Sequence, residues 1–156
     1  MTIPWTAGQR VLASDLNLAT GQQAWTTSFV PIWALPGGSP ALGNGTVNTG
    51  YLKLGRLCSG RYQYTFGSTT TFGTGTNAYN FTLPLSANTP ASNFWNIGSW
   101  SGLSGPDFYS GSAYLTTSGV MQLFYSGVST SVGPVVPNTW ASGGYLQIDF
   151  SYETTS

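Results

Sequence analysis

The apolar residues of this chain recur at every second position in three separate segments, and this spacing constrains the fold more than any other feature. In residues 58–66, cysteine, glycine and aromatic residues alternate with polar ones, and residues 79–85 and 146–152 repeat the alternation. Successive side chains of a β-strand point to opposite faces, so a period of two predicts a strand with one buried and one exposed face. The three segments are therefore predicted to be strands.

Shorter runs between glycine, proline, asparagine and serine residues extend this pattern from residue 28 onward. Weaker strand candidates are residues 28–33, 46–54, 94–100, 107–116 and 120–125. Gly55-Arg56 and Ser118-Gly119 fit tight turns between neighbouring candidates, and Gly60 is expected to mark a bulge. About eight closely spaced strands without crossover helices predict an all-β fold, an antiparallel β-sandwich or jelly roll over residues 28–156 that serves as an oligomerisation domain.

Residues 1–27 differ in texture and contain the one convincing helical stretch. Ser14 is a suitable N-cap, and Asp15 in the first turn opposes the positive end of the helix dipole. A helix of about two or three turns is marginal in water, so packing on another surface must order it. That surface is either the rest of the same chain or a neighbouring subunit, in which case residues 1–27 form an attachment arm. The residues assigned to this arm are Trp5, Leu12, Asp15, Leu16 and Trp25.

Ionisable side chains are scarce. The 156 residues include four basic and four acidic ones and no histidine. Charged residues make up 5% of the chain, against about a quarter in typical soluble domains. Acid–base and metal-dependent catalysis need ionisable groups that can be tuned. The sequence therefore argues against an enzyme, and it predicts no cofactor and no metal site.

Nucleic acids and membranes are not expected as partners. Four basic residues cannot neutralise the roughly six to ten phosphates of a strong contact. No apolar run approaches the ~20 residues that span a membrane, and the first residues lack the pattern of a signal peptide. The single Cys58 permits no intrachain disulfide and fits a chain made in a reducing cytosol. A formal net charge of zero gives little repulsion between copies, which favours association.

Two small groups of charges are predicted to pair, either within a subunit or across an interface. The basic group is Lys53, Arg56 and Arg61, and the acidic group is Asp149 and Glu153. Exposed pairs contribute only ~0–1 kcal/mol, so their role would be register or partner choice rather than stability. The alternative is an ordinary scatter of solvated charges.

Aromatic residues near glycine-, serine- and proline-rich turns could stack on sugars. The candidates for glycan contact are Trp95, Trp100, Tyr109 and Trp140. Aromatic residues at this density are also common in cores and subunit interfaces, and that alternative stays open.

Residues 41–85 resemble a recurring block in phage virion proteins, particularly those from phages of actinobacteria. The resemblance is carried by segments 42–47 (LGNGTV), 51–56 (YLKLGR), 66–70 (FGSTT) and 81–84 (FTLP), with the closing residues 152–154. Segments 5–8 (WTAG) and 12–17 (LASDLN) also look like the opening of many phage tail and head accessory proteins.

The resemblance implies a component of the virion surface, made in the host cytoplasm, with no active-site residues to carry over. Relatives with jelly-roll folds commonly assemble as trimers. We therefore expect a homotrimeric capsid decoration protein that contacts the major capsid protein through residues 1–27. The alternative is a minor tail protein or receptor-binding module that contacts other tail proteins and reads host-surface glycans.

Overall fold

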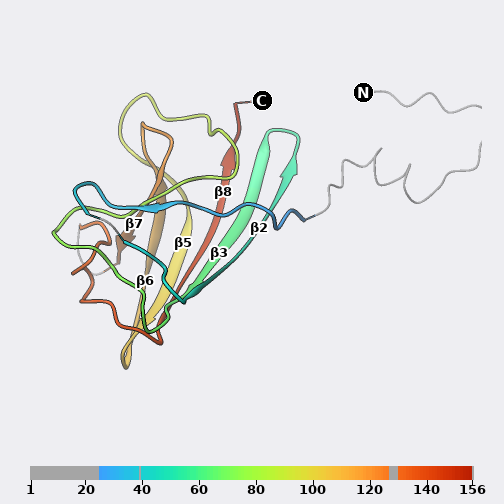
Figure 1. Ribbon diagram of the computed structural model, residues 1–156. Coiled ribbons are helices and arrows are strands. Elements are labelled where there is room, and N and C mark those ends of the chain that lie inside the picture. The colour runs from blue at the N-terminus through green and yellow to red at the C-terminus, as the bar shows by residue number, and fades with distance from the viewer. Residues whose placement is uncertain (1–24, 39, 127–129, 156) are drawn as a thin grey trace, which may run out of the picture.

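The computed structural model describes residues 25–38, 40–126 and 130–155, which contain eight strands. These are β1 (Trp33–Ala34), β2 (Thr46–Leu54), β3 (Leu57–Thr65), β4 (Asn80–Phe81), β5 (Trp95–Ser104), β6 (Asp107–Leu115), β7 (Met121–Tyr125) and β8 (Tyr145–Glu153). All pairings are antiparallel, and the order across the sheet is β1-β4-β7-β6-β5-β8-β3-β2 (Figure 1). The prediction of an all-β antiparallel fold is confirmed.

The strands form one curled sheet, a half-barrel, where the sequence had suggested two facing sheets. The C-terminal strand β8 is responsible, because it pairs with β3 along one edge and with β5 along the other. A strand bonded on both sides leaves no break in the sheet. The β2–β3 hairpin and the β5–β6–β7 group are therefore joined side by side and curl around a shared interior.

Tight turns set the register of three hairpins, and two of these turns lie where the sequence predicted them. Gly55 has a φ of 59° and is the first residue of the two-residue turn between β2 and β3, a position that favours glycine. Gly105, with a φ of 61°, occupies the same position between β5 and β6. Between β6 and β7, the Thr116 amide donates to the Val120 carbonyl at 2.9 Å across the predicted Ser118-Gly119 turn.

The bulge expected at Gly60 lies elsewhere. Gly60 pairs regularly with Tyr51 and Phe150, and its lack of a side chain makes room for the Phe150 ring, which a Cβ would meet at 2.8 Å. The register shifts instead in β5, between Asn96 and Gly98. A bulge increases the local twist and bend of a sheet, so this one contributes to the curl.

Two predicted strands are much shorter than the alternation suggested. In the predicted strand 28–33, only Trp33 lies in a strand, as the first residue of β1. In the predicted strand 79–85, only the two residues of β4 do. The flanking amides bond to loops rather than to a neighbouring strand: the Tyr79 amide donates to the Val132 carbonyl at 2.9 Å. Burial alternates along residues 29–35 without a continuous strand ladder, whereas in the second segment the alternation stops after Phe81.

The sheet has two unlike faces. On the inner face the side chains of β3 and β8 are almost completely buried, as Tyr62, Ile148 and their neighbours show. Loop residues complete the interior on the open side of the half-barrel; they are Leu35, Phe66, Tyr79, Ala87, Val132 and Trp140. We call the opposite, solvent-facing side of β2, β3, β5, β6, β7 and β8 the outer face.

Residues 25–34 run from one edge of the sheet to the other, and we call them the crossing segment (Figure 1). At its start Thr26 exchanges backbone hydrogen bonds with Tyr51 of β2, at 2.8 and 2.9 Å. At its end Trp33 pairs with Phe81 of β4. The crossing segment therefore ties the two outermost strands together. The helix expected within residues 1–27 falls at positions 1–24, outside the described residues.

Candidate functional site

The outer face presents rows of hydroxyl and amide side chains. Strand register places Ser112, Ser99, Asp149 and Arg61 in one row across β6, β5, β8 and β3. The next row consists of Ser110, Ser101, Gln147, Gln63 and Asn48. These side chains are exposed or half-buried. The face is therefore polar with few charges, which suits hydrogen bonding to a neutral partner.

The predicted pairing of the charged groups is confirmed within one chain. Arg56 contacts Glu153 at 3.0 Å and Arg61 contacts Asp149 at 3.6 Å, measured between nitrogen and oxygen atoms. All four side chains remain at least half exposed, so solvent screens both pairs. Lys53 lies in register with Cys58 and joins neither pair. No contact with a partner is needed to satisfy these four charges.

Two of the four aromatic residues proposed for glycan contact are core residues. Trp100 is 3% exposed and donates through Nε1 to the Phe124 carbonyl at 2.9 Å. Trp140 is 4% exposed, packs against Trp100, and donates to the Gly133 carbonyl at 3.0 Å. The expectation of ligand contact is wrong for both, because the curl of the sheet and the loop that carries Trp140 enclose them.

The other two proposed aromatic residues remain accessible. Trp95 begins β5 and is 45% exposed. Tyr109 is half-buried, packs edge-on against Tyr125 with ring centroids 5.8 Å apart, and donates its hydroxyl to Asp107 at 3.4 Å. The two belong to opposite ends of the β5–β6 hairpin, so they do not form one site.

Of the residues assigned to the arm, Trp5, Leu12, Asp15 and Leu16 lie outside the described residues. Trp25 is half exposed and lies over Gly50, where a Cβ would come within 1.8 Å of the indole nitrogen. Gly50 is in register with Arg61, so Trp25 covers the β2 end of the outer face. Glycine at position 50 is required for this close approach.

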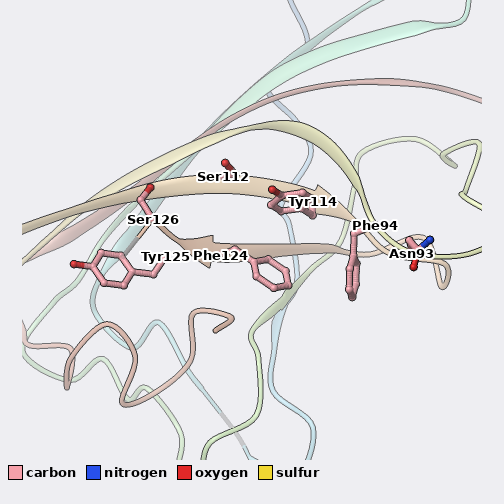
Figure 2. Close-up of a pocket in the computed structure, with 7 residues that line it drawn as sticks. All are labelled: Asn93, Phe94, Ser112, Tyr114, Phe124, Tyr125 and Ser126. Atoms are coloured by element: carbon pink, nitrogen blue, oxygen red, sulfur yellow. The ribbon is translucent and has the colours of Figure 1, made fainter. Parts of the chain in front are cut away.

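An aromatic pocket that the sequence had not indicated lies at the other end of the outer face, where β6 and β7 meet the loop before β5 (Figure 2). Its volume is about 470 Å³. The lining residues are Asn93, Phe94, Ser112, Tyr114, Phe124, Tyr125 and Ser126. We call it the aromatic hollow. One signal was available: Tyr114 and Phe124 occupy the polar side of their strands' alternation, in register with Gln122 and Ser112.

Asn44, Gly67 and Thr69 form a structural clamp between two loops. Asn44 Oδ1 accepts hydrogen bonds from the backbone amide and the hydroxyl of Thr69, both at 2.9 Å. The backbone amide of Asn44 donates to Thr69 Oγ1 at 2.8 Å. A Cβ on Gly67 would meet Asn44 Oδ1 at 2.2 Å. These residues therefore hold the two loops together, and none of them lines the aromatic hollow.

Cys58 and the core tyrosines are ionisable groups buried in the interior of the half-barrel. Burial raises the pKa of the Cys58 thiol, which keeps it protonated and unreactive. Burial also raises the pKa of Tyr62, Tyr64, Tyr79 and Tyr152. Among the described residues, no three histidine, cysteine or acidic side chains group as metal ligands would.

The comparisons with known proteins identify no relative of this chain. No protein-family model, no curated protein and no solved structure matches this chain. In the part of the chain that the structure describes, no helix has the length and apolar character needed to cross a membrane.

Proposed function

We propose that this chain is a non-enzymatic structural protein of a phage virion, a homotrimeric capsid decoration protein that attaches through residues 1–27. The resemblance of residues 41–85 and of segments 5–8 and 12–17 to phage virion proteins supplies the class. The structure contributes one supporting observation, which concerns the crossing segment.

The observation that carries the proposal is the exposed apolar surface of the crossing segment. Val30 is 69% exposed and Ile32 is 64% exposed, although both belong to a segment that the sheet holds at each end. The preceding residue, Phe29, turns inward instead, and its ring stacks on the Tyr62 ring with centroids 6.1 Å apart. Exposed apolar side chains that lie close together are typical of a surface that a partner covers, and this supports the proposal.

The crossing segment overlaps the last three residues of the arm, and this continuity supports a partner that contacts both. The exposed apolar surface would be covered when the arm lies on a neighbouring protein, either a second copy or the capsid. The zero formal net charge removes the repulsion that would keep copies apart. Threefold symmetry would repeat the same apolar contact around the axis.

Removal of residues 1–24 tests the attachment role. We expect the truncated chain to fold, because the core contacts described above all lie within residues 25–155, and we expect it to lose binding to particles that lack the protein. Sedimentation of mixtures of particles and protein measures the binding. Undiminished binding of the truncated chain would contradict the arm.

A double substitution, Val30→Thr with Ile32→Thr, tests the apolar surface while keeping both side chains β-branched. Light scattering of the parent protein should give three times the chain mass of 16.5 kDa, and the double variant should shift toward the monomer. The matched control is Phe108→Ala, which removes a 62% exposed apolar side chain from the outer face. Equal masses for the parent and the double variant would contradict the role of the crossing segment.

The second candidate function is a minor tail or receptor-binding module that recognises host-surface glycans. The aromatic hollow is the observation that favours it, in place of the buried Trp100 and Trp140. Location on the particle separates the two functions: electron cryomicroscopy would place the chain across the capsid lattice in one case and only on the tail in the other.

A further inference from the structure

We propose that the aromatic hollow is a binding site for a neutral sugar unit of a glycan. This inference does not depend on a capsid or tail location, because both parts of a particle face the outside. It assigns a ligand class to residues Asn93, Phe94, Ser112, Tyr114, Phe124 and Ser126.

Four aromatic residues line the hollow, and the rings of three of them pack against one another. The rings of Phe94 and Phe124 are 5.5 Å apart between centroids and inclined by 59°, and those of Tyr114 and Phe124 are 5.0 Å apart and inclined by 73°. Phe94 remains 48% exposed. The C–H faces of a pyranose ring are weakly positive, and they pack on the negative faces of such rings.

Hydrogen-bonding groups border the same wall. Figure 2 shows Asn93 near one end of the hollow and Ser126 near the other, with Ser112 between them on β6. Within the described residues, no hydrogen bond engages the side chains of Asn93, Ser112, Tyr114 or Ser126. An amide and three hydroxyl groups are therefore free to bond a ligand that carries many hydroxyl groups of its own.

The chemistry of the lining indicates a neutral ligand. All seven lining residues are uncharged, and a charged ligand would lose hydration without an opposite charge to replace it. The volume of about 470 Å³ falls within the roughly 300–1,000 Å³ of small-molecule sites. An apolar peptide segment would leave the free amide and hydroxyl groups unsatisfied, so the lining favours a sugar over such a partner.

Local structure holds both ends of the hollow in place. Asn93 has a φ of 64°, a left-handed conformation that asparagine tolerates better than most residues, and it directs the chain from the loop into Phe94. At the other end the Ser126 amide donates to the Ser110 carbonyl at 3.2 Å. Backbone strain of this kind often accompanies a functional site.

Saturation-transfer NMR tests the proposal with the full chain. The probes are methyl glycosides of glucose, galactose, mannose and N-acetylglucosamine at millimolar concentration, followed by an array of neutral and acidic glycans. We expect saturation transfer to the ring protons of at least one neutral glycoside. Affinity for the best array ligand is then measured by titration calorimetry.

Four variants locate the binding. Phe94→Ala should weaken binding about tenfold, equivalent to ~1.4 kcal/mol. Asn93→Gly keeps the left-handed backbone while removing the amide, and Tyr114→Phe keeps the ring while removing the hydroxyl, so each should weaken binding several-fold. Phe108→Ala removes an exposed aromatic residue outside the hollow and should leave affinity unchanged. Circular dichroism confirms that each variant is folded.

Three results would overturn the proposal. The first is the absence of saturation transfer to every neutral probe. The second is sugar binding that the Trp95→Ala substitution abolishes and Phe94→Ala does not, which would move the site from the hollow to Trp95. The third is loss of self-association in Phe94→Ala without any sugar binding, which would assign the aromatic hollow to a second copy of the chain. A capsid location on the particle would contradict the tail role and leave the sugar proposal intact.

Discussion

The inner and outer faces of the sheet are built from the same strands and differ in almost every physical property. On β3 the inward residues Tyr62 and Tyr64 are at most 2% exposed, while the outward Arg61 and Gln63 face solvent. The inner face is continuous across the sheet and closed by loops. The outer face is polar in the middle and aromatic at its two ends, at Trp25 and at Phe94. The inner face supplies the stability of the fold, and the outer face is the one on which we propose binding.

Most inner tyrosine hydroxyls are satisfied within the core. Tyr62 donates to the Thr82 carbonyl at 2.9 Å, and Tyr79 donates to the Phe72 carbonyl at 2.7 Å. Tyr64 differs, because its buried hydroxyl has no hydrogen-bond partner. The inner face is therefore closely packed with few unsatisfied polar atoms. Substitutions on the two faces should give very different free energies of unfolding.

The largest effect is expected for Trp100→Ala on the inner face. It removes a buried ring and the hydrogen bond to the Phe124 carbonyl, so the free energy of unfolding should fall by about 3–5 kcal/mol. Urea denaturation followed by fluorescence measures the loss. The matched control, Trp95→Ala on an exposed ring, should cost less than about 1 kcal/mol. Equal losses would break the distinction between the buried and the exposed aromatic residues.

Alkaline pH should weaken the inner face by a somewhat smaller amount. The pKa values of Tyr62, Tyr64, Tyr79 and Tyr152 are raised by burial, so these hydroxyls ionise in the unfolded chain first. Stability is then complete well below pH 10, where none of the groups is ionised in the unfolded chain. It falls as pH rises through and above 10, by about 3 kcal/mol between pH 8 and 10.5 for the four groups together. Urea titrations across this range test the sign; a flat profile would contradict it.

A matched pair of substitutions on β3 isolates single hydroxyl groups. Tyr62→Phe should cost about 1 kcal/mol, because it leaves the Thr82 carbonyl without its donor. Tyr64→Phe should be neutral or stabilise by up to about 1 kcal/mol, because it removes a buried hydroxyl that has no partner. Thermal unfolding of both variants gives the comparison, and a destabilised Tyr64→Phe protein would show that this hydroxyl is satisfied in solution.

The smallest effect is expected for the ion pairs of the outer face. Arg61→Gln should lower the free energy of unfolding by no more than about 0.5 kcal/mol, because both partners are half exposed. The difference from the parent should shrink further in 1 M salt. A loss above 2 kcal/mol would mean that this pair is buried, as it would be inside an oligomer.

Local patterns predicted much of the fold. Strands β2, β3, β6, β7 and β8 follow the predicted segments within one or two residues, and the glycine turns at 55 and 119 lie where expected. The pairing of Arg56 and Arg61 with acidic residues followed from the scarcity of alternatives. The candidate site was predicted poorly, because the aromatic hollow is formed by residues 93–94, 112, 114 and 124–126. These belong to three separate segments that only the fold brings together.

The sequence by itself determined the all-β character, the alternation of faces and the tight turns, because these depend on backbone geometry over a few residues. Tertiary structure alone decided that β8 lies between β3 and β5, that one curled sheet forms, and that Trp100 and Trp140 are enclosed while Phe94 is not. The physical reason is that strands pair through backbone groups that all residues share, so the side chains of one strand do not specify which strand lies beside it. Arg61 and Asp149, 88 positions apart, became neighbours only through that pairing.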